Sequence, residues 1–403
     1  MISSVGTDSA AVITTARGME RYFLDWVVND AYPLWATAGV EPATGGFVES
    51  LDQDGTPIAE ARRARVQTRQ VYAFAQAAEL GWRGPAGAIA TRGIRYFIDK
   101  YRRQDGLFRT LVAIDGAALD DSVLLYDQAF ALLGMAAAYK LTRPDREWAQ
   151  QADTLLDALN RHLKHPGGGF ASGLTNRIPL LSNPHMHLFE ACLEWRDLSG
   201  NPAWRILADD LGALALARFI DSANGVLRER FDEAWNPVAG TMGRIVEPGH
   251  QFEWAWLLLR WRTEAHPDAR RAALRLIEIG ERAGVCDGVA VDGLLDDFTI
   301  RIASARLWPQ TERLKAAALA AALTGDSRQW MRAVAAAKAL RQYLATRTPG
   351  VWRDTLGADG TFLAGPAPAG NLYHIVAAIL ALTNALRHVQ VPAQLTLNDQ
   401  ESL

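Results

Sequence analysis

Cysteine is scarce in this sequence, and its scarcity bears on where the protein works. The 403 residues hold two cysteines, Cys192 and Cys286, both in apolar surroundings. Small secreted domains depend on several cysteine pairs, whereas cytosolic proteins keep buried thiols reduced. The N-terminus also lacks a basic start followed by an apolar core, the pattern of a secretory signal. We therefore expect a cytoplasmic protein in which neither cysteine is the nucleophile.

Long apolar runs and an excess of charge of one sign are also missing. No stretch of the chain reaches the roughly 18 consecutive apolar residues of a membrane-spanning helix. Lysine and arginine number 42 against 45 aspartates and glutamates, which gives a net charge of −3. This balance provides no electrostatic reason to bind nucleic acid or an anionic membrane. We expect neither partner, and the sequence leaves open a monomer or a homodimer.

Two common cofactor motifs are absent as well. The run Gly167-Gly168-Gly169 is not followed by Lys-Ser/Thr, which excludes a phosphate-binding P-loop. The chain has no His-Glu-x-x-His and no closely spaced cysteine pair, which are typical of zinc sites. A metal held by His185, His187 and a carboxylate remains a minor alternative. We expect no cofactor, and activity that survives chelation and dialysis.

The chain does have a long internal repeat. Short Gly-centred segments recur about every 60 residues, a longer period than that of common two-helix solenoids. Their glycines are Gly46, Gly106, Gly169, Gly225, Gly288 and Gly350. Each gap holds two Ala/Leu/Arg/Glu-rich stretches with 3.6-residue periodicity, for example 122–141 with 145–164 and 182–199 with 202–220. The pattern predicts six helical hairpins.

Six helical hairpins of similar size favour an all-α fold, an (α/α)6 barrel with short β-hairpin loops at one mouth. The helix that follows each Gly segment is expected to belong to the inner ring, because it begins at the mouth where that segment lies. An open α-solenoid of the same units is the alternative. We expect residues 1–14 to form a flexible leader and residues 15–403 to form a single catalytic domain.

Polar side chains near the starts of the expected inner helices converge on one cavity. They are Arg69, Tyr126, Asp127, Asn183, His185, His187, His250, Glu253, Trp308, Glu312 and His374. His250 and His374 lie on different helices, and histidines with pKa values near 6.5 move protons in both directions at neutral pH. Glu253 follows His250 by three residues on the same helix face, so we expect it to orient that imidazole.

Further residues of this set suit a sugar. The guanidinium of Arg69 fits an oxygen that becomes negative during a reaction. Trp308 and Tyr126 offer flat walls for the C–H faces of a sugar, and Glu312 follows one turn after Trp308.

His185 and His187 compete for one place at the cavity. Residues two apart on a helix lie on different faces, so only one of the pair can face the cavity. We expect that residue to be His187, with Asn183 one turn earlier on the same face.

Several motifs together resemble the N-acylglucosamine 2-epimerase and mannose isomerase superfamily of (α/α)6 barrels. The matching segments are residues 69–72, 183–191, 247–254 and 306–312, and the pair Tyr373-His374. The resemblance implies cofactor-free interconversion of a free sugar through ring opening and a cis-enediol. It implies His250 and His374 as the acid/base pair and Arg69 near the reacting oxygens. It also implies a sugar site lined by Asn183, His187, Glu253, Tyr126 and Trp308.

The reaction itself admits alternatives at this stage. We favour isomerisation of D-mannose and D-fructose, ahead of 2-epimerisation of an N-acyl-hexosamine or of cellobiose. A glycoside hydrolase on the same barrel is a further alternative, because Asp127 with Glu253 or Glu312 offers the two carboxylates that hydrolysis needs. A sugar-binding protein without activity is the last alternative.

Overall fold

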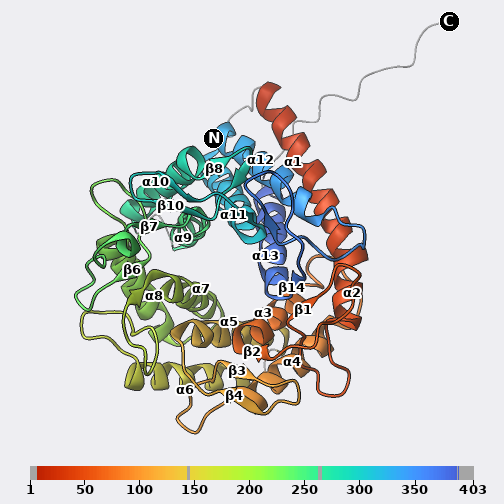
Figure 1. Ribbon diagram of the computed structural model, residues 1–403, viewed down its shortest axis with the longest axis vertical. Coiled ribbons are helices and arrows are strands. Elements are labelled where there is room, and N and C mark those ends of the chain that lie inside the picture. The colour runs from red at the N-terminus through yellow and green to blue at the C-terminus, as the bar shows by residue number, and fades with distance from the viewer. Residues whose placement is uncertain (1–6, 143–145, 262–265, 388, 390–403) are drawn as a thin grey trace, which may run out of the picture.

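Helices alternate between an inner and an outer ring in the computed structural model of this chain, as Figure 1 shows. The structure describes residues 7–142, 146–261, 266–387 and 389. The inner helices are α3 (Ala64–Ala75), α5 (Leu125–Thr142), α7 (Ser182–Leu198), α9 (Pro248–Arg260), α11 (Leu307–Thr324) and α13 (Gly370–Arg387). Their side chains are buried on nearly all sides, as the apolar composition of these stretches requires.

The outer helices cover the inner ring with one amphipathic face each. They are α1 (Thr7–Trp26), α4 (Ala86–Tyr101), α6 (Glu147–His162), α8 (Pro202–Leu214), α10 (Pro267–Ala283) and α12 (Ser327–Leu344). A π-helical turn continues α1 into α2 (Tyr32–Thr37). Among the described helices, none combines the length and apolarity that crossing a bilayer requires.

The ring is closed, so the expected (α/α)6 barrel is confirmed and the open solenoid is wrong. Each inner helix packs against the next, and α13 packs against α3. In the outer ring α1 packs against α12. At the join, Gln70 of α3 donates a hydrogen bond to the carbonyl of Ala369, just before α13, at 2.6 Å. The inner helices follow the Gly segments, as the sequence predicts.

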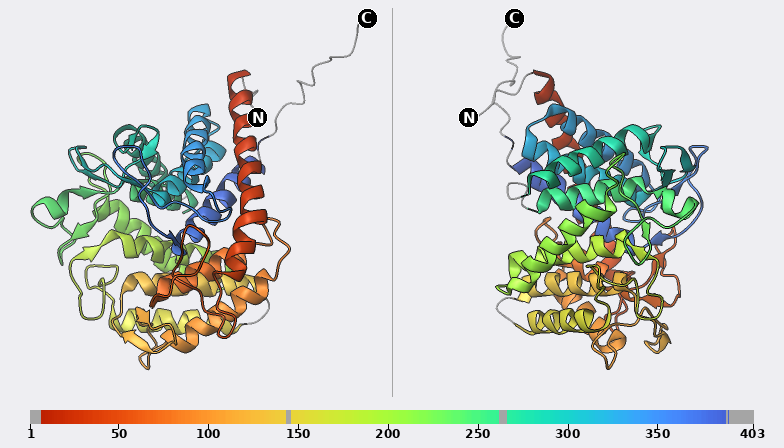
Figure 2. Two further views of the ribbon diagram at one scale, coloured as in Figure 1. Left: turned by 45° about the vertical axis from the view of Figure 1, so that its right-hand side comes forward. Right: turned by 90° about the vertical axis from the view of Figure 1, so that its left-hand side faces the viewer.

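Short strands lie in the loops at one end of the helices, as the side views of Figure 2 show. The strands are β1 (Ser50–Leu51), β2 (Arg62–Arg63), β3 (Leu111–Val112), β4 (Ala118–Asp120), β5 (Leu180–Leu181), β6 (Arg230–Phe231), β7 (Ile245–Val246), β8 (Val285–Cys286), β9 (Val289–Ala290), β10 (Gly293–Leu295), β11 (Ile300–Ile302), β12 (Ala305–Arg306), β13 (Thr355–Leu356) and β14 (Ala367–Pro368). Most pairs join neighbouring repeats, and β1 with β14 joins the first repeat to the last.

A side chain in the first turns of an inner helix holds the Gly segment that precedes it. Gln128 accepts a hydrogen bond from the backbone N–H of Phe108 at 2.8 Å and donates to the carbonyl of the same residue at 2.9 Å. Gln67, Gln251 and Gln310 do the same for Phe47, Leu227 and Ala290. We call this contact the amide clamp. It fixes each loop on its inner helix and satisfies backbone groups that are buried.

The expected leader, residues 1–14, is wrong for residues 7–14. Helix α1 begins at Thr7, and Ile13 is buried in the core. The rest of that leader, residues 1–6, lies outside the described residues, as do residues 390–403 of the expected domain. The apolar residues of the first turns of α1 are interrupted by Thr and Ser, which hid its helical periodicity.

Candidate active site

One cavity at the strand-bearing mouth of the barrel receives side chains from all six inner helices. Its volume is about 360 Å³. Its lining comprises Arg63, Arg65, Val66, Arg69, Tyr126, Asn183, His187, Glu247, His250, Glu253, Arg306, Trp308, Asp354, Pro368, Gly370, Asn371 and His374. Of the residues that the sequence predicts to converge on the cavity, Asp127, His185 and Glu312 are absent from the lining and the others are present.

His250 lies at the start of α9 and carries a positive charge. Its Nδ1 donates to Glu229 Oε2 at 3.0 Å and lies 3.8 Å from Glu247 Oε2. Burial by itself lowers the pKa of His250, but the carboxylates of Glu229 and Glu247 outweigh it and raise that pKa to about 10. At neutral pH this imidazolium can give up a proton.

The prediction that Glu253 orients His250 is wrong. Glu229, which directly precedes strand β6, orients it instead. Glu253 lies one turn deeper on α9 and approaches His187, whose Nδ1 is 3.8 Å from Glu253 Oε1. Burial and the nearby negative charge of Glu312 raise the pKa of Glu253 well above its usual value. The raised pKa favours the protonated form of Glu253, in which its carboxyl group can donate a hydrogen bond to a sugar oxygen.

His374 faces the same cavity from α13 and is neutral. Its Nδ1 lies 2.8 Å from Glu312 Oε1, and beside an ionised Glu312 this nitrogen is the donor, which leaves Nε2 unprotonated. Burial, then the positive charges of Arg69 and Lys315, lower the pKa of His374 well below 6.5. The prediction that Glu312 lines the sugar site is wrong, because Glu312 is fully buried behind His374.

Trp308 separates the two catalytic candidates. Its ring centroid is 5.1 Å from that of His250 and 5.9 Å from that of His374. A Cβ on Gly249 would come within 2.4 Å of the Trp308 ring, so the glycine before His250 lets the indole reach the cavity. The two imidazoles thus border one flat apolar wall, which suits the C–H face of a pyranose.

Arg69 of α3 enters the cavity beside α13, the helix that carries His374. It donates to the hydroxyl of Tyr126 at 2.6 Å, and its guanidinium carbon lies 4.1 Å from the ring centroid of Phe130. Its Nε is buried and has no partner within the described part of the chain. The head of Arg69 is therefore held in place and keeps donor capacity for a ligand.

His187 and Asn183 line the cavity from α7, and His185 does not. His185 Nε2 accepts from the N–H of Phe170 at 2.9 Å, and its Nδ1 donates to the carbonyl of Leu181 at 2.7 Å. In this repeat the histidine replaces the glutamine of the amide clamp. The metal site that included His185 is accordingly wrong.

Groups of histidine and carboxylate lie close enough to hold a cation in three places. They are His187 with Glu190 and Glu253, Glu229 with Glu247 and His250, and Glu253 with Glu312 and His374. The first and third share Glu253, and Lys315 Nζ lies 2.6 Å from Glu312 Oε2. The ammonium of Lys315 already supplies positive charge to these carboxylates.

Three residues in or near the site were not predicted from the sequence. Glu229 lies in a Gly segment, where a carboxylate is typical of solvent-exposed loops. Glu190 accepts a hydrogen bond from the hydroxyl of Tyr373, and both side chains are buried. Helix α7 has a mixed composition, so its sequence did not indicate that Glu190 is buried. Lys315 lies in an Ala-rich stretch, and a charged residue among alanines was the feature of the sequence that could have indicated its role.

The hydrolase alternative loses one of its two carboxylates. Asp127 is fully buried outside the cavity, where it pairs with Arg65 at 3.2 Å and accepts from the Thr110 hydroxyl at 2.9 Å. Glu253 then has no partner of the predicted pair in the lining, since Glu312 is also behind the wall.

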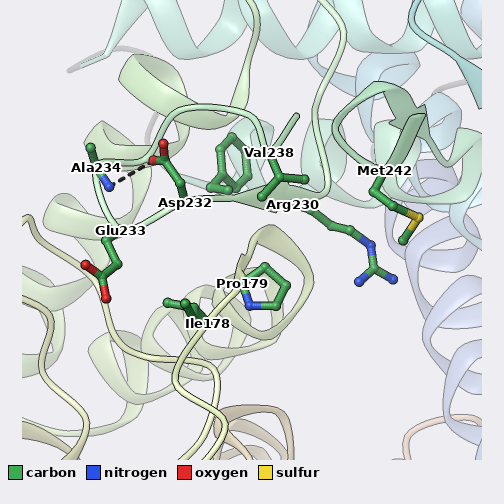
Figure 3. Close-up of a pocket in the computed structure, with 9 residues that line it drawn as sticks. Ile178, Pro179, Arg230, Asp232, Glu233, Ala234, Val238 and Met242 are labelled. Carbon is green, nitrogen blue, oxygen red and sulfur yellow. Dashed lines mark hydrogen bonds between the residues drawn. The ribbon is translucent and has the colours of Figure 1, made fainter. Parts of the chain in front are cut away.

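A larger hollow of about 700 Å³ lies among the loops around β5 and β6, as Figure 3 shows. Its lining is mostly apolar and includes Pro179 and Met242, and it has no histidine. Its Asp232 accepts a hydrogen bond from the N–H of Ala234 at 2.9 Å. The histidines that could transfer protons at neutral pH line the barrel cavity and not this larger hollow.

Comparisons with known proteins agree with this geometry. The model of the family described as N-acylglucosamine 2-epimerase (GlcNAc 2-epimerase) matches residues 45–378. The mannose-6-phosphate isomerase of Rhizobium meliloti (strain 1021) is 47% identical over 373 residues, covering 90% of this chain and 96% of the relative. The D-mannose isomerase of Thermobifida fusca is 28% identical, covering 79% and 83%. The structure of cellobiose 2-epimerase from Spirochaeta thermophila superposes with a TM-score of 0.83 at 20% identity, covering 93% and 98%.

Proposed function

Since the chain belongs to the N-acylglucosamine 2-epimerase family and is a sugar isomerase or epimerase, we propose that it interconverts D-mannose and D-fructose. The observation that carries the proposal is that two histidines line one cavity in surroundings that shift their pKa values in opposite directions. His250 is held as a cation by two carboxylates, and His374 is held neutral with Nε2 free. An isomerase needs an acid and a base at the same time.

Ring opening uses both groups, and His374 Nε2 takes the proton of the anomeric hydroxyl and releases it to water before the next step. A proton leaves the anomeric hydroxyl and another reaches the ring oxygen, so that the C1–O5 bond breaks and C1 becomes a carbonyl. His250 is placed to give the second proton, because its imidazolium is the stronger acid of the pair. Glu253, in its protonated form, can hold a sugar hydroxyl in the same cavity meanwhile.

His374 then acts as the base between C1 and C2. Its Nε2 takes the proton from C2 of the open aldose, the C–H electron pair forms the C1=C2 bond of the cis-enediol, and O1 gains negative charge. The guanidinium of Arg69 stabilises that charge. Return of the proton to C1, with transfer of the O2 proton to O1, gives the ketose.

Epimerisation at C2 is a second candidate, favoured by the family description. It requires that the proton return to the opposite face of C2, and His250 faces the cavity across Trp308 from His374. The same residues thus allow both reactions, and the outcome depends on whether the enediol is protonated at C1 or at C2.

A phosphorylated substrate is favoured by the 47% identical relative, which is a mannose-6-phosphate isomerase. The arginines at the rim argue for the free sugar instead. Arg63 pairs with Glu49 at 2.7 Å, and Arg306 pairs with Asp292 at 2.9 Å, so their charges are already balanced. We expect the enzyme to prefer D-mannose over D-mannose 6-phosphate.

Proton NMR in D2O tests the proposal. D-mannose, D-glucose, D-fructose, N-acetylmannosamine, cellobiose and D-mannose 6-phosphate are incubated separately with the protein. We expect D-mannose and D-fructose to interconvert, with deuterium entering C1 of the fructose. Conversion of N-acetylmannosamine or cellobiose to the C2 epimer alone would replace isomerisation by epimerisation. A higher kcat/KM for the 6-phosphate would overturn the preference for the free sugar.

A further inference from the structure

Beneath the catalytic cavity, the barrel encloses a lysine that the proton-transfer steps do not use. Lys315 lies two turns into α11 and is fully buried. Burying an isolated ammonium is very costly, so a lysine in this place needs strong compensation. The side chains around it provide that compensation from several helices.

Three carboxylates and two aromatic rings surround Lys315. Its Nζ lies 2.6 Å from Glu312 Oε2 and 3.9 Å from the ring centroid of Trp256. The titratable groups that face it are Glu312 on its own helix, Glu253 on α9, Glu190 and His187 on α7, and Tyr373 and His374 on α13, with Arg69 of α3 beyond His374. Burial lowers the pKa of Lys315, but its interactions with the carboxyl groups around it, that of Glu312 first, outweigh burial and raise that pKa. Lys315 is therefore a cation.

Glu312 is shared between this cation and the base of the reaction. One carboxylate oxygen, Oε1, accepts from His374 Nδ1 at 2.8 Å, while the other, Oε2, faces the ammonium of Lys315. Burial tends to protonate Glu312, and Lys315 acts against that tendency. A protonated Glu312 has a hydrogen of its own to donate, and would favour the His374 tautomer that carries its proton on Nε2.

We propose that Lys315 is a positioning residue that keeps Glu312 an acceptor, and thereby keeps Nε2 of His374 free to take the substrate proton. Lys315 does not line the cavity and does not touch the sugar. Its effect reaches the reaction through Glu312 and through direct repulsion of a proton on His374. This inference deepens the proposed function and rests on it for the turnover measurements.

The first test replaces Lys315 by methionine, which keeps the length of the side chain and removes its charge. In Lys315→Met we expect kcat to fall by about 10- to 100-fold at pH 7, with KM changed less than threefold, because a base is lost and no sugar contact is lost. The acid limb of the kcat profile should move up by about one pH unit or more, because the cation opposing protonation is gone. A profile of normalised rates does not depend on the fraction of folded enzyme.

Two variants serve as controls. Lys315→Arg retains the positive charge, so its acid limb should stay near that of the unmodified enzyme even if packing lowers the rate. Lys140→Met removes a lysine that is half-exposed at the far end of α5 and pairs with Glu79 at 3.5 Å. It should leave rate and profile unchanged. A lower rate in Lys315→Met with an unshifted acid limb would reduce Lys315 to a structural residue and overturn the proposal.

A second readout does not require turnover. The 15N chemical shifts of His374, assigned by comparison with His374→Asn, report the tautomer directly. In the unmodified protein at pH 7 we expect a protonated Nδ1 and an unprotonated Nε2, and in Lys315→Met a shift toward protonated Nε2. Protonated Nε2 in the unmodified protein would overturn the proposal even if the methionine variant did not fold. Failure of all sugars to react would refute the proposed function but leave this measurement valid.

Discussion

His250 and His374 are the same residue type in one cavity, yet the structure moves their pKa values in opposite directions. The sequence suggests activity with an ordinary imidazole pKa near 6.5. Instead, His374 must be neutral to act as a base, and its lowered pKa places the acid limb of the rate profile below 6.5. His250 must be charged to act as an acid, so activity should be lost as pH rises through about 10. A broad plateau between these limits follows.

Glu229→Gln tests the origin of the charge on His250. Removal of one of the two carboxylates should lower the pKa of His250, so the alkaline limb of kcat should move down by about one pH unit or more. The rate at pH 9 should fall to about half of that at pH 7 or less, because a His250 pKa near 9 leaves about half of the imidazole protonated there. Glu233→Gln, which alters an exposed carboxylate of the same loop, is the matched control and should leave the profile unchanged. An unshifted limb in Glu229→Gln would assign the alkaline limb to another group.

Arg69→Lys tests the stabilisation of charge on O1. A lysine keeps the positive charge but loses the fork that Tyr126 and Phe130 hold in place, so kcat should fall by roughly 10²-fold. Steady-state kinetics on D-mannose measure the change, and circular dichroism checks the fold. Arg95→Lys, on the exposed face of α4, should behave as the unmodified enzyme does. Near-normal turnover in Arg69→Lys would remove Arg69 from the reaction.

The residues of the site were predictable where they lie at the start of an inner helix. His250, His374 and Arg69 follow this rule, because helices that begin at one mouth bring their first turns together. Their charge states were not predictable. Glu229 precedes His250 by 21 residues in a loop, and only the packed barrel brings the two within 3.0 Å. The pairing assumed from sequence, with Glu253, followed helix spacing and was wrong.

At the scale of elements, the amide clamp explains why His185 is present. Glutamine holds the Gly segment in four repeats, and His185 does so in the third. His185→Gln should therefore keep both activity and stability. His185→Leu should lower the free energy of unfolding by about 1–3 kcal/mol, because the buried N–H of Phe170 loses its acceptor. Urea unfolding measures both variants, and loss of activity in His185→Gln without loss of stability would point to a role in catalysis.

The helices were predicted better than the loops between them. A 3.6-residue pattern marks the helices, and Ala and Leu favour them. The strands are two or three residues long and mostly join different repeats. They are too short to show the alternation of apolar and polar residues that predicts a strand. The glutamine of the clamp does recur at a spacing of 20 residues from its partner in three repeats, a regularity that the sequence contained.

At the scale of the whole molecule, the ring closes on aromatic side chains. Trp352 stacks on Trp35 with ring centroids 4.8 Å apart, and Trp35 donates to the carbonyl of Gly350 at 3.0 Å. Trp352→Ala should lower the free energy of unfolding by about 3–5 kcal/mol, since both rings are fully buried. Denaturant unfolding measures the loss. Leu363→Ala, which truncates an exposed side chain nearby, should change it by less than about 0.5 kcal/mol.

The number and size of the repeats predicted that the ring closes. They did not predict which side chains make the closing contacts. Trp35 and Trp352 are separated by most of the chain, and the sequence around either residue does not indicate that the two are in contact. The repeat predicts that a first and a last unit meet. Which side chains meet is decided by the curvature that six packed helix pairs accumulate.

The join between the last repeat and the first is made by helix packing and hydrogen bonds rather than by a peptide connection. Arg17 of α1 donates to the carbonyl of Leu386 near the end of α13 at 3.2 Å, so the first and last helices lie side by side. The order in which the repeats are translated is therefore separate from the order in which they surround the cavity. A circularly permuted chain, opened at an exposed turn of another repeat and bridged here, would trace the same ring and bring the same histidines face to face.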